Sequence, residues 1–205
     1  MRRVEVSLGE RSYPVSIGTG LVGRAGELLS PHARSGRIVA VTDENVWAAQ
    51  GARLSASGLD LVPVVMPPGE ASKSWAGLET VTERLIELGV ERGDSILAFG
   101  GGMIGDLAGF AAAVVKRGCA YVQVPTSLLA QVDSSVGGKT AINGKAGKNL
   151  VGAFHQPAAV LIDPATLDTL PERELRSGYA EVVKYGLIAD PAFFAWCEAD
   201  FAALL

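Results

Sequence analysis

The chain has 205 residues, of which 48% are hydrophobic, 20% are charged and 25 are glycine, and its formal net charge is −4. Disordered chains combine low hydrophobicity with high net charge, and collagen needs a triplet glycine period, so this composition excludes both classes. The sequence pI near 5.3 lacks the basic character of nucleic-acid-binding domains, so we expect no nucleic-acid partner.

The apolar runs predict a sheet of mostly parallel strands. Residues 4–8 and 13–17 alternate around a turn and predict an opening hairpin. Continuous apolar runs, typical of strands buried on both faces of a parallel sheet, follow at residues 37–42, 61–66, 95–99, 121–124 and 159–162. Pro63 cannot donate a ladder hydrogen bond, so its strand is expected at a sheet edge or to begin there.

Helices are predicted between these strands. Ser74 is a suitable N-cap for a helix over residues 75–88, and Gly89 is positioned to end it. The apolar stripe of this helix consists of Leu78, Val81, Leu85 and Leu88. Another helix follows the glycines at residues 100–102. The alternation of buried strands and helices indicates an α/β fold with a doubly wound, mostly parallel sheet.

The pattern changes after Asp163. A long helix is expected over residues 171–187, another helix is expected from Pro191, and no further strand pattern occurs. We therefore predict an α/β domain over residues 1–163. Residues 164–205 are predicted to be the first helices of an all-α domain that is truncated in mid-helix.

Targeting signals and disulfides are not expected. The longest apolar run, residues 107–115, is too short to span a bilayer, so no membrane partner is expected. The N-terminus has two arginines but lacks the apolar core of a signal peptide. Cys119 and Cys197 form no CxxC motif, so we predict two buried free thiols in a reducing cytoplasm.

Gly100, Gly102 and Gly105 form a GxGxxG pattern between a predicted strand and a predicted helix. Such glycines let backbone N–H groups at a helix N-terminus approach a pyrophosphate. The acidic residue that usually follows about 20 positions later is absent. Asp43, after the strand at residues 37–42, is a substitute candidate for binding a sugar hydroxyl. Close packing of the helix on the strand is the alternative reason for the glycines.

Residues 132–140 resemble a phosphate-binding P-loop, but Asp133 stands where the first glycine is required and would repel a phosphate. A nucleoside triphosphatase is therefore disfavoured. Lys139, Lys148 and Asn149 are expected on neighbouring glycine-rich loops, where they could hold a phosphate and a carboxylate. Solvated lysines in turns are the alternative.

Glu181 and Lys184 are three residues apart and share a face of a predicted helix. They form either an exposed ion pair or, because their neighbours are apolar, a buried carboxylate that needs a cation or a metal. The chain has 2 histidines and no histidine–cysteine cluster, so it cannot complete a three-ligand catalytic zinc site by itself. His155 is a candidate site residue, whereas His32 is expected in a surface turn.

Five stretches, taken together and in this order, resemble the 3-dehydroquinate synthases. They are PGExxKS at residues 68–74, GGGMIGDLAGF at 100–110, VPTSLLAQVDSSVGGKT at 124–140, GKNLVGAFHQP at 147–157 and LPxRExxSGxAEVVKYG at 170–186. Met103 in place of the usual valine and Ser127 in place of a frequent threonine are conservative departures from the family pattern.

The resemblance implies an NAD-dependent and metal-dependent carbon–oxygen lyase of the shikimate pathway, with zinc or cobalt as the metal. Its substrate would be 3-deoxy-D-arabino-heptulosonate 7-phosphate and its products 3-dehydroquinate and phosphate. The implied steps are transient oxidation of a ring alcohol, phosphate elimination, reduction of the ketone, ring opening and an aldol closure. NAD is then a catalyst that is regenerated in each turnover.

The same resemblance implies roles for individual residues. The implied NAD contacts are Asp43, Gly69, Glu70, Lys73, Gly102, Met103, Ile104, Gly105, Asp106, Thr126, Ser127, Lys139, Lys148, Thr166, Leu167, Asp168 and Thr169. The implied substrate-binding and catalytic residues are Asp133, Lys139, Asn149 and Lys184, and the implied metal ligand is Glu181. Arg117 matches an arginine that reaches into the neighbouring subunit's site, which implies a homodimer.

Family members are considerably longer and carry two histidine metal ligands in a helical second domain. We therefore expect the 205-residue chain alone to bind NAD weakly and to show no turnover. Sister sugar phosphate cyclases of the valiolone or inosose type are the nearest alternative. Polyol dehydrogenases share the GGGxxxD loop, but they are not expected to carry DSSVGGKT or GxAEVVKY. A non-catalytic NAD-binding module is the alternative outside the enzymes.

Overall fold

The computed structural model describes residues 1–33 and 36–200. Its strands are β1 (Arg2–Val6), β2 (Tyr13–Ile17), β3 (Arg37–Asp43), β4 (Asp60–Met66), β5 (Ser95–Gly100), β6 (Ala120–Pro125), β7 (Lys139–Gly144), β8 (Gly147–Phe154) and β9 (Ala159–Ile162). Its α-helices are α1 (Ala25–Leu29), α2 (Glu44–Ser55), α3 (Trp75–Glu87), α4 (Gly102–Val114), α5 (Glu172–Ala189) and α6 (Pro191–Asp200). A π-helix spans Ala130–Ser134, and short 3₁₀ helices include Ser30–His32, Val115–Arg117 and Pro164–Thr169.

Seven strands of the described residues form one sheet in the order β1-β2-β9-β6-β5-β3-β4. β1 and β2 form the predicted antiparallel hairpin, with Val4 opposite Val15, although β1 begins earlier than expected. All other pairings in this sheet are parallel. β4 lies at the edge, as Pro63 predicted. The mostly parallel sheet expected from the apolar runs is therefore confirmed.

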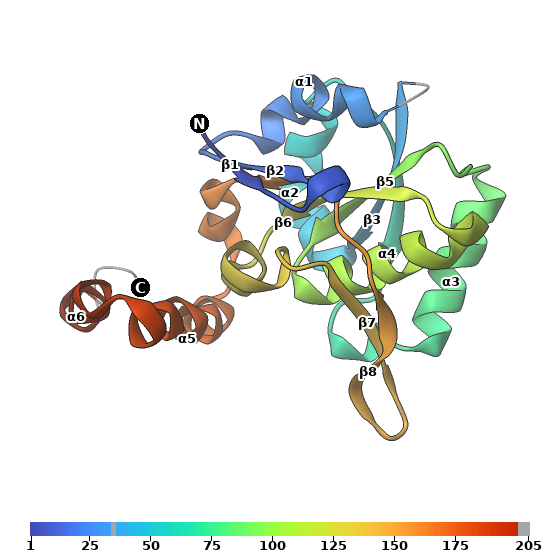
Figure 1. Cartoon of the computed structure of the whole chain (residues 1–205). Coiled ribbons are helices and arrows are strands. Elements are labelled where there is room, and N and C mark those ends of the chain that lie inside the picture. The colour runs from blue at the N-terminus through green and yellow to red at the C-terminus, as the bar shows by residue number, and fades with distance from the viewer. Residues whose placement is uncertain (34–35, 201–205) are drawn as a thin grey trace.

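Helices cover both faces of this sheet (Figure 1). Along β3, Val39 and Val41 face the core formed with α3 and α4, whereas Ile38 and Ala40 face the core formed with α1 and α2. Alternate residues of a strand point to opposite faces, so a strand buried on both sides is apolar at every position. This packing explains the continuous apolar runs and confirms the doubly wound arrangement.

Side-chain caps begin two of the helices. The Ser74 hydroxyl accepts a hydrogen bond from the Gly77 N–H and caps α3, as predicted, and Gly89 follows the helix with φ +73°. α2 was not predicted. Its N-cap is Asp43, whose carboxylate accepts hydrogen bonds from two N–H groups of the first turn. Polar and small residues such as Gln50 occupy its buried face, which is why the sequence shows no apolar stripe there.

The expectation of glycine-rich loops after the π-helix is wrong. This region is a second sheet made of the β7–β8 hairpin, in which Lys139 lies opposite Phe154. Glycines weaken an isolated strand, but α4 packs on β7 so closely that a Cβ on Gly109 would lie 2.5 Å from the Thr140 side chain. Contact with α4 therefore imposes strand geometry that the local sequence does not favour.

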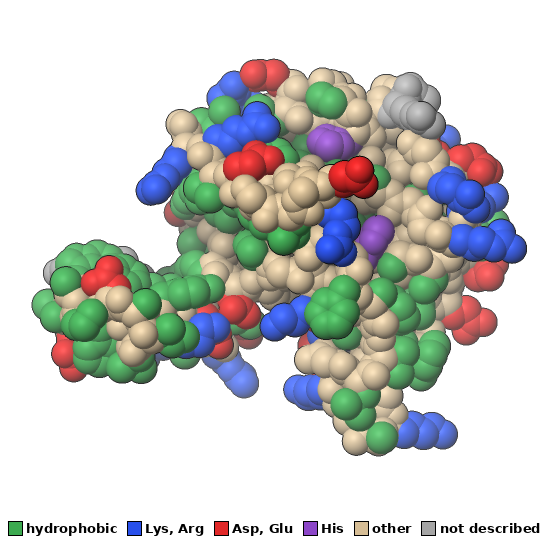
Figure 2. Space-filling model, in the orientation of Figure 1, with side chains coloured by type: hydrophobic (Ala, Val, Ile, Leu, Met, Phe, Trp, Pro, Cys, Tyr) green, Lys and Arg blue, Asp and Glu red, His purple; other side chains and the backbone are tan. Residues whose placement is uncertain are grey.

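α5 and α6 pack on each other and form a helical arm that extends from the sheet (Figure 1). They confirm the helices predicted after residue 170, whereas the predicted uncapped helix end at residues 201–205 lies outside the described residues. Leu187, Ile188 and Trp196 are exposed, and hydrophobic side chains cover much of the arm in Figure 2. In the described part of the chain, no helix combines the length and apolarity needed to cross a membrane.

Cys119 and Cys197 are free and buried, as predicted. Burial raises the pKa of the Cys119 thiol to about 11, because desolvation disfavours the thiolate. At pH 8 we expect less than about a tenth of Cys119 to react with iodoacetamide in the time that labels it fully in guanidinium chloride. The measurement is the mass of the Cys119 peptide, and rapid labelling of the native protein would contradict the predicted protection.

Candidate active site

The carboxyl ends of the parallel strands open onto a cleft. The chain leaves β3 toward one face of the sheet and β5 toward the other, and a crevice forms at such a switch point. A cavity of about 890 Å³, here the strand-end cavity, lies there and is lined by Asp43 and Gly102 among others. A second cavity of about 470 Å³, here the hairpin cavity, lies against β7 and β8. Asp106, Ser134 and Asn149 line both cavities.

The glycines after β5 bring a helix N-terminus to the strand-end cavity. α4 begins at Gly102, and the N–H groups of its first turn lack helical carbonyl partners. A Cβ on Gly102 would lie 3.0 Å from the Ser134 hydroxyl, so glycine keeps this approach open. Gly105 instead faces the sheet, where a Cβ would lie 2.8 Å from the Gln123 side-chain oxygen. Close packing therefore accounts for both glycines: Gly102 admits Ser134 and Gly105 admits Gln123. Anion binding at the α4 N-terminus stays a prediction.

Lys73 lies between the two cavities and is only 4% exposed. Its ammonium group forms an ion pair with Asp106 and donates a hydrogen bond of 2.5 Å to Asn149 Oδ1. Burial raises the pKa of Asp106, and the positive charge of Lys73 opposes that rise. An ammonium group has three donors, so Lys73 keeps one for a ligand after these two contacts.

Hydrogen bonds tie the hairpin to the loop that carries Lys73. The side-chain amide of Asn143 donates to Glu70 Oε1 at 2.7 Å, and its oxygen accepts from the Asn149 N–H at 3.0 Å. The Asn143 N–H donates to the Lys73 carbonyl at 2.9 Å. Both Glu70 and Lys73 line the strand-end cavity, and Asn149 also lines the hairpin cavity. One asparagine thus connects the walls of both cavities.

A buried network positions the segment after β9. The carboxylate of Asp163 is fully buried and accepts hydrogen bonds from the N–H groups of Gly20, Val22 and Ala165 and from Arg53. Gln131 donates to Thr166 Oγ1 at 2.9 Å, and Gln50 donates to Thr169 Oγ1 at 2.7 Å. Thr166 therefore faces the buried network, and Thr169 lines the strand-end cavity.

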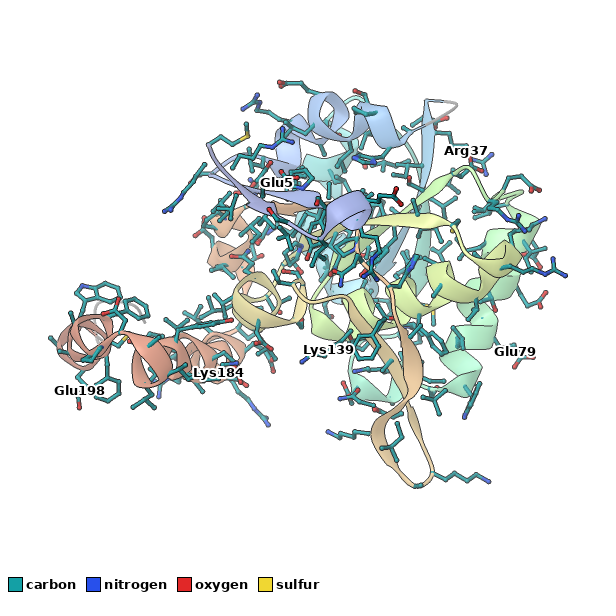
Figure 3. The ribbon with its side chains drawn as sticks, viewed as in Figure 1. Glu5, Arg37, Glu79, Lys139, Lys184 and Glu198 are labelled. Atoms are coloured by element: carbon teal, nitrogen blue, oxygen red, sulfur yellow. The ribbon has the colours of Figure 1, made fainter. Side chains whose placement is uncertain are left out.

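Asp133, Lys184 and Glu181 form a charged cluster between the helical arm and the hairpin cavity. Lys184 Nζ lies 3.0 Å from Asp133 Oδ1 and also pairs with Glu181. The carboxylates of Glu181 and Asp133 raise the pKa of Lys184. Figure 3 places Lys184 on α5 and Lys139 at the base of the hairpin, on opposite sides of the gap between arm and hairpin. All three side chains of the cluster are partly exposed. Glu181 is therefore intermediate between the exposed ion pair and the buried carboxylate that the sequence left open.

The residues implied by the family resemblance divide by position. Those that line the strand-end cavity are Asp43, Gly69, Glu70, Lys73, Gly102, Met103, Ile104, Asp106, Thr126, Ser127, Asn149 and Thr169. Those implied as NAD contacts that lie outside its lining are Gly105, Lys139, Lys148, Thr166, Leu167 and Asp168. Of the implied residues, Asp106, Asp133, Lys139 and Asn149 line the hairpin cavity, whereas Lys184 and Glu181 line neither cavity. Residues from six segments of the chain thus line two cavities that share part of their walls.

The two lysines expected on neighbouring loops are separated by the hairpin. Lys139 is the first residue of β7, whereas Lys148 lies beside the turn at its tip. At about 3.3 Å per residue, four residues of strand keep their backbones about 13 Å apart. Of the two, only Lys139 lines the hairpin cavity.

Three other candidates lie away from the cleft. Arg117 is exposed with φ +66° and follows α4 at the amino end of β6, the opposite edge of the sheet from the cleft. His155 stacks on Tyr121, and its ring nitrogen lies 2.9 Å from the Cys119 carbonyl oxygen. It lines neither the strand-end cavity nor the hairpin cavity. His32 lies in a 3₁₀ turn, as expected, but is half-buried.

Sequence reasoning missed three residues that organise the cleft: Asn143, Ser134 and Asp163. Ser134 lines both cavities, and Asp163 and Asn143 act through the hydrogen bonds described above. Ser134 lies within the quoted motif at residues 124–140, and Asn143 lies three residues after its end. No local signal distinguishes them from ordinary turn residues, because their partners are distant in sequence.

The described residues do not complete a metal site. Across residues 1–33 and 36–200, no group of three or more His, Cys, Asp and Glu side chains is arranged to hold a metal ion. Glu181 offers one carboxylate, which pairs with Lys184. A catalytic zinc site needs three protein ligands, so the donor set present does not by itself fit such a metal.

The fold and cleft define an open α/β protein with a cavity of about 890 Å³ at a topological switch point and a second cavity beside it. The family model described as 3-dehydroquinate synthase N-terminal matches residues 63–177. This match covers more than half of the chain, which belongs to the 3-dehydroquinate synthase family.

Curated relatives have the same name. The 3-dehydroquinate synthase of Zymomonas mobilis is 57% identical over 206 residues, which cover 98% of this chain and 54% of that protein. The 3-dehydroquinate synthase of Brucella ovis is 58% identical over 202 residues, which cover 97% of this chain and 53% of that protein. The chain therefore spans about half the length of the curated relatives it matches.

Solved structures of two cyclases are also similar. The 2-epi-5-epi-valiolone synthase of Streptomyces hygroscopicus, solved with NAD⁺ and Zn²⁺, has a TM-score of 0.88 and 32% identity over 99% of this chain and 57% of that chain. A 2-deoxy-scyllo-inosose synthase, solved with carbaglucose-6-phosphate, NAD⁺ and Co²⁺, has a TM-score of 0.79 and 30% identity over 89% of this chain and 50% of that chain. A probable glycerol dehydrogenase from Sinorhizobium meliloti, at 22% identity and a TM-score of 0.66, shares the fold alone.

Proposed function

We propose that this chain is the cofactor-binding part, and much of the substrate-binding part, of a 3-dehydroquinate synthase. The reaction would convert 3-deoxy-D-arabino-heptulosonate 7-phosphate to 3-dehydroquinate and phosphate in the shikimate pathway. The observation that carries the proposal is the position of the buried Lys73. Its ammonium group contacts Asp106 and Asn149, and each of these two residues lines the strand-end cavity and the hairpin cavity. A cofactor in one cavity and a substrate in the other would meet at this lysine.

The strand-end cavity fits NAD⁺. The first turn of α4 would offer N–H groups to the pyrophosphate, and Gly102, the first residue of this turn, lines the cavity. Asp43 and Glu70 supply carboxylate acceptors for ribose hydroxyls. Bound NAD⁺ supplies a temporary oxidation that acidifies the neighbouring C–H and so permits loss of phosphate.

Other NAD contacts are proposed from the family resemblance rather than from the cavity lining. They are Gly105, Lys139, Lys148, Thr166, Leu167 and Asp168. Lys148 lies beside the hairpin turn, so it would reach the cofactor only from the tip of the hairpin.

The hairpin cavity fits an acidic sugar phosphate. Lys139, Lys184 and Asn149 would hold the carboxylate and the phosphate, because ammonium and amide donors match both groups. Lys184 Nζ lies 3.0 Å from Oδ1 of Asp133, and this ion pair keeps the ammonium beside the cavity. Developing negative charge on the leaving phosphate would be stabilised by these same cations.

Glu181 is proposed to supply one carboxylate to a zinc or cobalt ion. The other ligands would have to come from groups other than those of the described residues, which hold no suitable cluster. Carboxylate is an ordinary ligand for both metals.

A homodimer in the cytoplasm is part of the proposal. Arg117 is exposed near the amino end of β6, whereas the cleft lies at the carboxyl ends of the strands. It therefore cannot serve the site of its own chain and is available to the site of a neighbouring subunit. The two cysteines are free, which suits a reducing compartment. We also propose that the α/β domain ends at residue 163 and that a helical domain begins at residue 164.

The test compares the 205-residue chain with the complete gene product. NAD⁺ at about 100 times its dissociation constant is expected to stabilise the complete product by about 2.7 kcal/mol. At the same NAD⁺ concentration, the melting temperature of the chain alone is expected to rise less than that of the complete product. We expect the complete product, loaded with zinc or cobalt, to release phosphate from the heptulosonate phosphate, and the chain alone to show no turnover. Absence of turnover by the metal-loaded complete product would overturn the proposed function.

The sister cyclases remain the second candidate, because their solved structures superpose over most of the chain. A substrate without a carboxylate separates the two candidates. Glucose 6-phosphate, whose carba analogue occupies the inosose synthase structure, is the probe. A 3-dehydroquinate synthase is expected to show no turnover with it, whereas cyclisation of glucose 6-phosphate would favour the inosose type.

A further inference from the structure

We propose that Asn143 is a positioning residue that sets the orientation of Asn149 and thereby couples the cofactor cavity to the substrate cavity. This inference rests on the proposed function for the identity of the two ligands. Asn143 itself lines neither cavity, and it is not among the residues that the family resemblance implies. Its role follows from hydrogen bonds at a β-bulge.

The bulge lies where the hairpin passes the loop that carries Lys73. Ile142 pairs with Val151, but Gly144 pairs with Gly147, so β8 has more residues than β7 in this interval. Asn149 is one of the extra residues and has φ +58°, a left-handed conformation that asparagine tolerates better than most side chains. Extra residues of a bulge have no ladder partner, so their backbone groups need other contacts.

Asn143 supplies that contact. Its side-chain oxygen accepts a hydrogen bond of 3.0 Å from the Asn149 N–H, and its side-chain nitrogen donates at 2.7 Å to the Glu70 carboxylate. A backbone N–H requires an acceptor and a carboxylate requires a donor, so these two partners fix the orientation of the amide. A carboxamide offers the two groups on separate atoms, an acceptor oxygen and a donor nitrogen, so it can serve two partners in different directions.

The held backbone directs the Asn149 side chain to Lys73, with a hydrogen bond of 2.5 Å to Nζ. The Asn143 N–H also donates to the Lys73 carbonyl at 2.9 Å, so both ends of this lysine are tied to the hairpin. Glu70 belongs to the strand-end cavity and Asn149 to both cavities. A ligand that orders Glu70 therefore also orders, through Asn143, the group that faces the substrate.

The first test is amide hydrogen exchange of the free 205-residue chain by NMR. N143A is expected to speed exchange of the Asn149 N–H at least about tenfold, because its acceptor is lost. N143D keeps an acceptor for this N–H but sets a carboxylate against Glu70, and N143D/E70Q restores a donor–acceptor pair in reversed order. We expect exchange to return to within about threefold of the wild type in N143D/E70Q.

The second test is steady-state kinetics of the complete gene product with the heptulosonate phosphate. N143A is expected to raise KM about tenfold while the NAD⁺ dissociation constant changes less than about threefold, because Lys73 keeps its ion pair with Asp106. K145A, at the exposed tip of the same hairpin, is the control and is expected to leave KM unchanged. E70Q alone supplies the reference for the double variant.

The outcomes separate the two proposals. Wild-type exchange of the Asn149 N–H in N143A, or an unchanged KM, would overturn the positioning role. A loss of folding in N143A would be seen as faster exchange throughout β7 and β8. In that case the comparison of N143D with N143D/E70Q is decisive, because the positioning role requires slow Asn149 N–H exchange to return in the double variant. If the complete product has no turnover while Asn149 exchange behaves as expected, the proposed function fails and the positioning of Asn149 by Asn143 stands.

Discussion

Replacing Lys73 with methionine is expected to lower the free energy of unfolding by about 2–4 kcal/mol and the NAD⁺ affinity about 10- to 100-fold. Methionine preserves most of the side-chain length but removes the ammonium group that pairs with Asp106 at a position only 4% exposed. Asp106 then stays buried without its cation, and Asn149 loses its 2.5 Å donor. Urea denaturation and calorimetric titration with NAD⁺ measure the two effects.

The stability defect of K73M is expected to grow with pH. Burial raises the pKa of Asp106 in the folded protein, and Lys73 opposes this rise, so its removal raises the folded-state pKa further. An acid with a folded pKa above its unfolded pKa loses stabilisation as pH rises from the unfolded value, about 3.9, toward the folded one. The difference in free energy of unfolding between wild type and K73M should therefore be larger at pH 8 than at pH 5.

K145M is the matched control, because Lys145 is exposed at the hairpin turn. Its free energy of unfolding should change by less than about 0.5 kcal/mol, as for most surface substitutions. If K73M and K145M are equally stable and bind NAD⁺ equally well, Lys73 does not have the role assigned to it between the cavities.

Replacing Asp163 with alanine is expected to lower the free energy of unfolding by about 3–5 kcal/mol. Its carboxylate is fully buried and accepts hydrogen bonds of 3.0 Å from both the Gly20 and Val22 N–H groups, besides those from Ala165 and Arg53. Alanine leaves the buried Val22 N–H and the partly buried Gly20 and Ala165 N–H groups without this acceptor, which costs more than the loss of the bonds themselves. Thermal and urea denaturation measure the effect.

Two variants control for D163A. D60A removes an exposed aspartate at the start of β4 and is expected to change stability by less than about 0.5 kcal/mol. D163N keeps the shape but replaces one acceptor with an NH₂ donor, so it should still cost about 1–3 kcal/mol. A D163A protein as stable as D60A would show that the network around Asp163 contributes little to folding.

The elements that could be predicted are those with a strong local signal. Strands buried on both faces have continuous apolar runs, as in residues 38–41 of β3 and 96–99 of β5, and Ser74 marks the start of α3. α2 and the β7–β8 hairpin were missed because their local sequences are polar or rich in glycine. Packing of Thr140 against Gly109 decides the conformation there, and that contact spans a long interval of sequence.

The candidate site was predicted in part for the same reason. A glycine turn before a helix is a local pattern, so the α4 N-terminus and Gly102 could be recognised in advance. The separation of Lys139 from Lys148 could not, because the pairing of β7 with β8 sets it. Asn143 has the sequence signature of any turn asparagine, and only its hydrogen bonds to Glu70, Lys73 and Asn149 distinguish it.

The sequence by itself determined the class of fold, the glycine-rich turn and, through its motifs, the family. These follow from periodicity and from short contiguous patterns, which report on local backbone geometry and burial. Only the tertiary structure decided which charged groups meet. Lys73, Asp106 and Asn149 come from three separate segments, and a buried ion pair forms where folding removes water from all of them together. The chemistry of the cleft is therefore a property of the packed layers, whereas the layers themselves are encoded locally.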